Sequence, residues 1–420
     1  MMKSNVIKVL EMTEEKMKNC LGNEKLRLKK SAFTRKIEDG LGAKKLLHLI
    51  LLRMYRALQL CIDDLYEKLD EKPITKQAVS KARMNLNPEY VREFFDETAK
   101  IAAEDDTLPA YKGMRIIAID GSTAALENTY DLKENFGCSG SKKDAATALI
   151  SMAYGPLDNV IYDCRIDKYA SSERDLAKLH INRLCELGLS GSLILVDRGY
   201  PSAEFISYLY EKGFHFVMRV REKWNLEADN TETEKWISVT HNGKKYPVRV
   251  IKVTLPTGEI ETLLTSLSEI QLQASEAGTL YFERWKIEVA YDFIKSKLQL
   301  ENFSGKKAVS VNQDFYATMY LGNLVAFVAG LADNQISEKD AESPKKYKYP
   351  RKANRNRTIA KLRERFISLL LEPDGEVREA MLQKIVDDVA KYPLSIKPNR
   401  VAKRKSSRSK RFHSAKKPVV

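Results

Sequence analysis

Short apolar runs rich in β-branched residues alternate with amphipathic segments through the middle of this chain. Two of the amphipathic segments, 171–188 and 203–212, have the length of helices, and 171–188 begins with a capping pattern. Five apolar runs have the length and composition of buried strands: residues 115–119, 145–154, 159–166, 192–196 and 214–220. Three adjacent strands, a helix, a strand, a helix and a last strand predict an α/β fold.

The segment 223–279 has a different pattern, in which polar and apolar positions alternate between turn residues. Asn242-Gly243 and Pro256-Thr257-Gly258 are placed where hairpins would turn. The pattern predicts β-hairpins, and the segment is therefore expected to be a β-rich insertion into the α/β part.

The first hundred residues carry few strand signals and predict helices. Thr75 is placed to cap a helix over residues 76–86. Gln77, Lys81 and Arg83 would give this helix a polar, basic outer face. Such a face is typical of a helix-turn-helix element that enters a DNA major groove, although an ordinary helical hairpin explains the pattern equally well.

Composition adds a nucleic-acid partner to this picture. The 420 residues carry a net charge of +14, which favours binding to a polyanion. Residues 397–420 contain ten Lys or Arg and no Asp or Glu, so this tail is too charged to fold alone. It is expected either to contact phosphates or to act as a solubilising tail. A second basic run, 345–357, precedes an amphipathic segment.

Cysteine and hydropathy patterns exclude several classes of protein. The five cysteines form no CxxC pair, which is typical of reduced thiols and not of a disulfide framework or a zinc site. The start of the chain lacks the apolar region of a signal peptide. The most apolar stretch, 46–60, contains two arginines and is too short to span a bilayer, so it predicts a buried helix. We expect a cytoplasmic protein that associates with nucleic acid and has no membrane partner.

Two aspartates follow predicted strands. Asp120 comes directly after 115–119 and Asp197 after 192–196, and each is followed closely by a glycine that would end the strand. Ligands of α/β proteins bind at such strand ends. Either aspartate alone is equally typical of a turn or a helix cap.

A third carboxylate lies on a predicted helix with three polar companions. On an unbroken α-helix, Tyr281, Arg284, Glu288 and Lys295 fall within roughly 60° of arc. Apolar residues occupy the neighbouring arcs, so the stripe resembles the floor of a site that handles phosphates. The alternative is a solvated charged face, which is common on helices.

Together these residues resemble a known family. The spacing Tyr-x2-Arg-x3-Glu-x6-Lys, preceded by DGS and DRGYPS after two strands, is similar to that of DDE transposases from bacterial insertion sequences. It is closest to the insertion-sequence-four group, over roughly residues 75–330. The resemblance implies an RNase H-like core in which Asp120, Asp197 and Glu288 hold two Mg²⁺ ions, which Mn²⁺ can replace.

The resemblance also implies DNA contacts. Tyr281, Arg284 and Lys295 would touch the DNA end, and Arg198, beside Asp197, is a further DNA-binding candidate. Members of the group carry a β-rich insertion, and some stack an aromatic from it on a flipped base. Trp224 and Trp236 are the candidates here, although either also fits the small core of the insertion itself.

The implied function is that of a transposase that binds terminal inverted repeats as a homodimer on paired double-stranded DNA ends. It would nick the end to free a 3′-OH, form a hairpin with the opposite strand, reopen it and transfer the strand into target DNA. Two alternatives stay open: a metal-dependent nuclease of the same fold that does not join strands, and an inactive DNA-binding derivative.

The expected organisation has six parts. These are a helical DNA-binding domain (1–105), the first part of the core (106–222), the β-rich insertion (223–279), the second part of the core with the signature helix (280–335), a helical basic region (336–396) and a disordered basic tail (397–420).

Overall fold

The computed structural model describes residues 4–34, 41–52, 56–141 and 144–397. The chain forms two compact units. Unit 2 comprises Ala102–Ala124 and Thr147–Phe293, and unit 1 comprises Met1–Ile101, Ala125–Ala146 and Ile294–Val420. Unit 1 therefore draws its residues from the N-terminal part, from the C-terminal part and from a segment in between.

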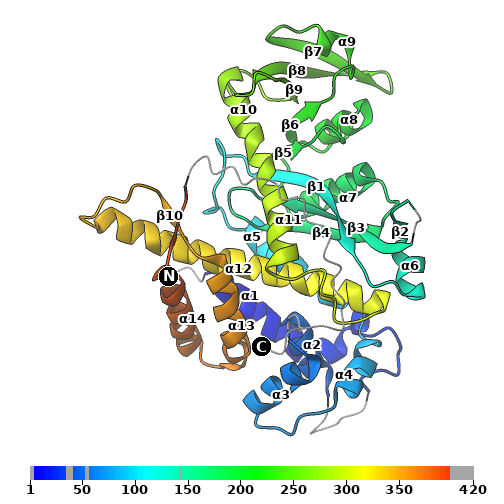
Figure 1. Ribbon diagram of the computed structural model, residues 1–420, viewed down its shortest axis with the longest axis vertical. Helices are drawn as coiled ribbons and strands as arrows, with labels where there is room; N and C mark the ends of the chain where they lie inside the picture. The colour runs from blue at the N-terminus through cyan, green and yellow to red at the C-terminus, as the bar shows by residue number, and fades with distance from the viewer. Residues whose placement is uncertain (1–3, 35–40, 53–55, 142–143, 398–420) are drawn as a thin grey trace. The chain divides into compact units, whose positions relative to one another are not determined.

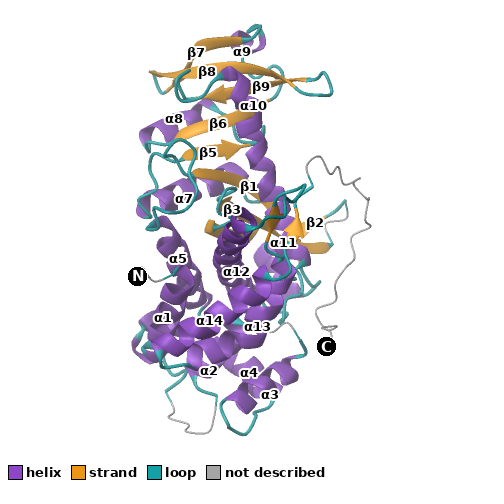
Figure 2. Cartoon of the chain, turned by 90° about the vertical axis from the view of Figure 1, so that its left-hand side faces the viewer, coloured by secondary structure: helices purple, strands orange, loops and turns teal. Residues whose placement is uncertain are grey.

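Unit 2 is built on a large mixed sheet. Within unit 2 the strand order is β3-β1-β5-β6-β9-β8-β7, with β4 also paired to β3, and Figure 2 shows β1, β5, β6, β8 and β7 one above another. The pairs β1–β5 and β5–β6 are parallel. The pairs β3–β4, β6–β9, β9–β8 and β8–β7 are antiparallel. The strands are β1 (Ile116–Ala125), β3 (Ala145–Tyr154), β4 (Ile161–Lys168), β5 (Leu193–Val196), β6 (His215–Val220), β7 (Glu234–His241), β8 (Lys244–Thr254) and β9 (Ile260–Thr265).

Helices flank and follow this sheet. The first, α7, begins where the Ser172 side chain accepts a hydrogen bond from the Asp175 amide, the capping arrangement expected from the sequence. The helices are α7 (Glu173–Glu186), α8 (Ala203–Glu211), α9 (Leu226–Asp229), α10 (Ala274–Phe282), the 3₁₀ turn η3 (Glu283–Trp285) and α11 (Lys286–Ser296). The predicted order of strands and helices is therefore present.

Two features of the sheet differ from the prediction. Gly121 does not end its strand, since β1 continues to Ala125. A Cβ atom at Gly121 would lie 2.7 Å from a Glu173 carboxylate oxygen, so the glycine allows that side chain to approach. The hairpins of 223–279 extend the core sheet, because β9 pairs with β6.

Unit 1 is mainly helical and is organised around α12 (Figure 1), which packs against α1, α2, α13 and α14. The 35-residue α12 is long and apolar enough to cross a membrane, but its most apolar window is 89% buried, as in a core helix. The elements are α1 (Asn5–Lys18), η1 (Cys20–Gly22), η2 (Glu24–Leu26), α2 (Ala43–Leu51), α3 (Leu58–Lys68), α4 (Lys76–Arg83), α5 (Pro88–Ala103), α6 (Tyr130–Phe136), β2 (Cys138–Ser139), α12 (Ala308–Glu342), β10 (Arg351–Lys352), α13 (Arg355–Leu371), α14 (Gly375–Ala390) and β11 (Leu394–Ser395).

The prediction of a basic face on α4 is wrong at Arg83. Its side chain is 3% exposed, and its guanidinium pairs with Asp314 at 3.1 Å and donates to Gln313 at 3.0 Å. These partners come from α12, so Arg83 fastens α4 to the core helix. Gln77 and Lys81 are exposed on α4.

Two other predicted segments are only partly described. The apolar stretch 46–60 is not one helix, because α2 ends at Leu51 and α3 begins at Leu58. Of the basic tail, residues 398–420 lie outside the described part of the chain.

Candidate active site

The helix that carries Glu288 is interrupted. The 3₁₀ turn η3 separates α10 from α11, so the angles expected for an unbroken α-helix do not hold across it. Arg284 nevertheless reaches Glu288 in the next turn, with 3.1 Å between Nη2 and Oε1. The 3₁₀ turn therefore still brings Arg284 and Glu288, two residues of the signature, into contact.

Arg284 joins two of the predicted carboxylates. Its side chain is only 1% exposed, and its Nη1 lies 3.5 Å from Oδ2 of Asp120. The guanidinium is flanked by the rings of Tyr281 and Trp285, with 5.8 and 4.9 Å to the ring centroids. A positive charge thus lies between a carboxylate from the sheet and one from the helix.

Asp197 lies beside Asp120 because β1 and β5 run parallel. Ala118 pairs with Leu195, which brings the following residues of both strands to the same end of the sheet. Nη2 of Arg219 lies 2.9 Å from the Asp197 carboxylate, and the Tyr281 hydroxyl donates to it at 3.3 Å.

The pKa values of Asp120 and Asp197 are shifted in opposite directions. Burial raises the pKa of Asp120 to about 6, against the attraction of Arg284, and the nearby carboxylates of Glu173 and Asp197 add to the rise. Burial also acts on Asp197, but the Arg198 amide and the cations of Arg284 and Arg219 lower its pKa below the ordinary value. Ionising Asp120 is therefore costly unless a further positive charge is present.

The donor chemistry of this cluster suits a hard divalent cation, because carboxylate oxygens are the ligands that Mg²⁺ prefers. Within the described residues, no three Asp, Glu, His or Cys side chains are arranged so that they could hold a metal ion. The carboxylates of Asp120 and Glu288 instead both face the Arg284 guanidinium, which supplies the positive charge in this arrangement.

The predicted DNA-contact residues lie in different surroundings. Tyr281 is 2% exposed, and its hydroxyl faces Asp197, so it does not point outward. Arg284 is likewise buried, whereas Arg198 is exposed. Lys295 lies in the last turn of α11, seven residues beyond Glu288 in sequence and within the part of that helix assigned to unit 1.

The two tryptophans proposed for stacking are both hydrogen-bonded within unit 2. Nε1 of Trp224 donates to the Pro201 carbonyl at 3.4 Å, and Nε1 of Trp236, on β7, donates to Glu269 at 2.7 Å. Trp236 is 40% exposed. The remaining tryptophan, Trp285, is the one that packs against Arg284, and the sequence reasoning passed over it although it directly follows that residue.

The sequence did not identify two charged residues that lie beside the aspartates of the site, Arg219 and Glu173. Arg219 bridges Asp197 and Glu261, and a charged residue within the apolar run of β6 was a usable signal for it. Glu173 reaches the Asp120 region from the start of α7, where the sequence indicated only a helix-capping pattern.

Replacing Asp120 by Asn is expected to stabilise the metal-free protein at neutral pH. The folded protein keeps the Asp120 proton up to pH about 6, whereas the unfolded chain loses it near 3.8. This proton-linked stability is therefore complete below pH about 4 and is lost as the pH rises to about 6. The asparagine has no proton to lose, so the variant should gain up to about 3 kcal/mol over the wild type.

Thermal unfolding in EDTA between pH about 4 and 8 measures this difference. The advantage of Asp120→Asn should grow through the window and then level off. Parallel stability curves for the two proteins would show that Asp120 ionises without cost.

Comparison with known proteins gives three similarities. The family described as Transposase DDE domain matches residues 111–324. The chain is 26% identical over 288 residues to transposase InsG for insertion sequence element IS4 of Escherichia coli strain K12, covering 60% of this chain and 61% of that protein. The matched part of this chain thus covers less than two thirds of the length of that transposase. The cryo-EM structure of a piggyBac transposase synaptic complex with hairpin DNA is similar over 90% of this chain and 82% of that one, with a TM-score of 0.47 and 12% identity.

Proposed function

Because the chain belongs to the Transposase DDE domain family, we propose that it is the transposase of a bacterial insertion sequence. One observation supports this most strongly. Asp120, Asp197 and Glu288 are far apart in sequence, but Arg284 pairs with both Asp120 and Glu288 in unit 2. The Tyr281 ring that flanks Arg284 donates its hydroxyl to Asp197. This is the constellation expected of phosphodiester chemistry on an RNase H-like core.

Members of this family generally use divalent metal ions. In the present arrangement the Arg284 guanidinium pairs with Asp120 and Glu288. After that guanidinium moves away, the carboxylates of Asp120, Asp197 and Glu288 would hold two Mg²⁺ ions, or Mn²⁺ in their place. When bound, such ions supply an activated water and stabilise the charge of an in-line displacement at phosphorus.

The residues around the carboxylates have their own tasks in this proposal. Arg219 and the Tyr281 hydroxyl orient Asp197, since both are held at hydrogen-bonding distance from its carboxylate. Arg284 neutralises Asp120 and Glu288 before metal binds. Once it is released, its guanidinium would contact the phosphate beside the scissile bond, as would Lys295.

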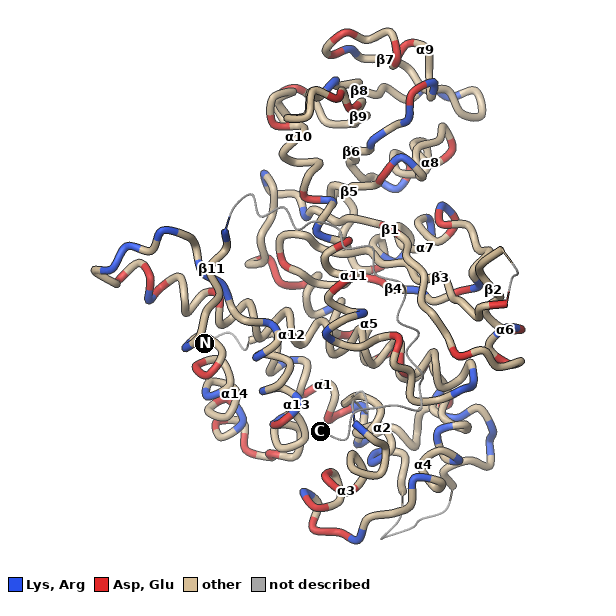
Figure 3. The backbone as a smooth tube through the Cα atoms, in the orientation of Figure 1, with Lys and Arg blue, Asp and Glu red and all other residues tan. Residues whose placement is uncertain are grey.

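Basic segments provide the DNA contacts. In unit 1, Gln77 and Lys81 are exposed on α4, and Lys and Arg residues line the segment from 345 to 352 (Figure 3). These cations and the basic tail would bind phosphates, whereas α4 would read the terminal inverted repeats. A homodimer would hold two ends together. Stacking of a flipped base would fall to Trp224 or Trp236.

The proposed reaction nicks the end of the element and frees a 3′-OH. That hydroxyl attacks the opposite strand to form a hairpin, which is reopened before strand transfer into target DNA. Incubating the protein with Mg²⁺ and a DNA fragment that carries the sequences flanking its coding region tests this. Nicked, hairpin and joined products are expected, and nicking without any joined product would favour a nuclease instead.

Deleting residues 397–420 is expected to weaken binding to specific and random duplexes alike. The ten cations of this tail lack acidic neighbours in sequence, so they should contact phosphates, which carry no sequence information. The slope of log affinity against log salt should therefore become shallower in fluorescence titrations. A tail of equal length with every Lys and Arg replaced by Ser is the matched control and should behave like the deletion. Unequal losses on the two duplexes would make the tail a sequence reader.

A further inference from the structure

A buried polar chain leads to the backbone of Asp120. It consists of Ser151 on β3, Asp163 on β4 and His180 on α7, and each of these side chains is 0% exposed. Burying an aspartate and a histidine in a core is costly unless every polar atom is paired. Apolar residues of similar volume would often stabilise such a core equally well. The burial of these three polar side chains therefore needs an explanation, and the groups that they hold in place provide one.

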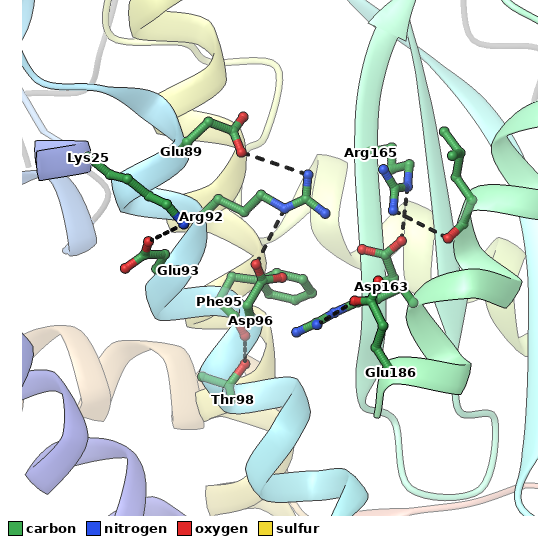
Figure 4. Close-up of polar contacts among 12 residues, drawn as sticks. Lys25, Glu89, Arg92, Glu93, Phe95, Asp96, Thr98, Asp163, Arg165 and Glu186 are labelled. Atoms are coloured by element: carbon green, nitrogen blue, oxygen red, sulfur yellow. Dashed lines mark hydrogen bonds and ion pairs between the residues drawn. The ribbon is translucent and has the colours of Figure 1, made fainter. Parts of the chain in front are cut away.

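Successive hydrogen bonds connect Arg165 to the backbone of Asp120 through these three side chains. Asp163 faces Arg165 in Figure 4, and the Arg165 Nε donates to it at 3.0 Å. Nδ1 of His180 lies 2.8 Å from the same carboxylate oxygen of Asp163, and Nε2 lies 2.9 Å from the Ser151 hydroxyl. The Ser151 hydroxyl then donates to the backbone carbonyl of Asp120 at 3.3 Å.

A second hydroxyl reaches the same carbonyl from the signature helix. Tyr291, one turn after Glu288 on α11, donates to the Asp120 carbonyl at 2.8 Å and lies 3.4 Å from the carbonyl of Ile150. Tyr291 is 5% exposed. It therefore ties the helix that carries Glu288 to the two strands β1 and β3 at the residue whose side chain belongs to the candidate site.

Each link restricts the next. The Ser151 hydroxyl has one hydrogen, which it donates to the Asp120 carbonyl, so Nε2 of His180 must donate to the Ser151 oxygen. The carboxylate of Asp163 accepts from Nδ1, so the ring donates at both nitrogens and its orientation is set. Nε2 is then directed at Ser151, and this contact holds the serine rotamer that faces Asp120. Such outer partners fix the place of a ligand in metal sites, where their loss typically costs about 10–100-fold in metal affinity or activity.

We propose that Asp163, His180, Ser151 and Tyr291 are positioning residues that fix the Asp120 backbone, and so the place from which the Asp120 carboxylate would reach a divalent cation. The inference rests on the proposed function of that carboxylate. It assigns these four residues to the site although none of them is one of the four signature residues.

Ser151→Ala and Tyr291→Phe test this proposal, because each removes one hydroxyl and little else. Mn²⁺ binding, measured by electron paramagnetic resonance on the full-length protein without DNA, should weaken about tenfold in each variant and further in the double variant. The Mg²⁺ concentration for half-maximal cleavage should rise in parallel, with DNA affinity unchanged. His180→Gln, which can still donate to Ser151, should retain more Mn²⁺ affinity than His180→Ala.

Tyr162→Phe is the matched control. Tyr162 is as buried as Tyr291 and donates to Asp158 at 2.6 Å, away from Asp120. Its loss should lower the melting temperature but leave Mn²⁺ affinity at the wild-type value. Equal Mn²⁺ affinity of the wild type, Ser151→Ala and Tyr291→Phe would overturn the proposal, as would equal weakening by Tyr162→Phe. A wild type that binds Mn²⁺ but cuts no DNA overturns only the proposed function, whereas one that binds no Mn²⁺ overturns both.

Discussion

Asp120→Asn, Asp197→Asn and Glu288→Gln should each reduce DNA cleavage by more than about a hundredfold, since even partners one step removed from a metal typically contribute 10–100-fold. DNA binding should be nearly unchanged, because carboxylates repel phosphates and carry no base contacts. Cleavage of an end-labelled duplex and a gel-shift titration measure the two effects separately.

Asp292 provides the control for this series. It lies on the same helix one turn beyond Glu288 and is exposed. Asp292→Asn removes the same charge from α11 without touching the cluster, so its cleavage rate should match that of the wild type. A triad variant that keeps wild-type, metal-dependent nicking would be removed from the catalytic set.

Arg284→Ala is expected to have the second-largest effect, on both stability and cleavage. The buried guanidinium pairs with Asp120 and Glu288, so its loss leaves two carboxylates facing each other without a counter-charge. Each such contact is worth about 1.5–3 kcal/mol, and a contact of this size that tightens in the transition state changes the rate about ten- to a hundredfold. Glu288 is 37% exposed, so water will screen part of the loss in stability.

Divalent cations separate the two roles of Arg284. If it substitutes for the metal charge, Mg²⁺ should raise the melting temperature of Arg284→Ala by more than that of the wild type. Glu283→Ala is the control, since Glu283 forms a salt bridge with Lys286 near the start of α11, and surface pairs of this kind contribute about 0–1 kcal/mol. Equal damage from Glu283→Ala and Arg284→Ala would contradict the central position given to the guanidinium.

Strands and helices of unit 2 were predictable because their signals are local. The run 145–154 coincides with β3, and the predicted helix 171–188 contains α7. Both were predictable because the spacing of apolar residues along a segment indicates which of its faces will be buried. The end of β1 was not predictable in this way. Gly121 looked like a strand terminator, but it lies within β1, where its lack of a side chain leaves room for Glu173 from a different element.

Arg83 shows the same limit for charged residues. A basic residue on a short polar helix is usually solvated, and the sequence offered no reason to expect otherwise. Its partners Gln313 and Asp314 lie far away in the chain, on α12, and only packing of α4 against that helix makes burial of the guanidinium tolerable.

The sequence by itself determined the elements of the α/β part and the residue types available for phosphate chemistry, because both depend on spacing along the chain. Only the tertiary structure decided that Arg284 is buried between Asp120 and Glu288 and that Arg219 holds Asp197. It also decided that Ser151, His180 and Asp163 lie beneath the site. These contacts depend on strand register and on helix packing between residues distant in sequence, and no local pattern encodes either of them.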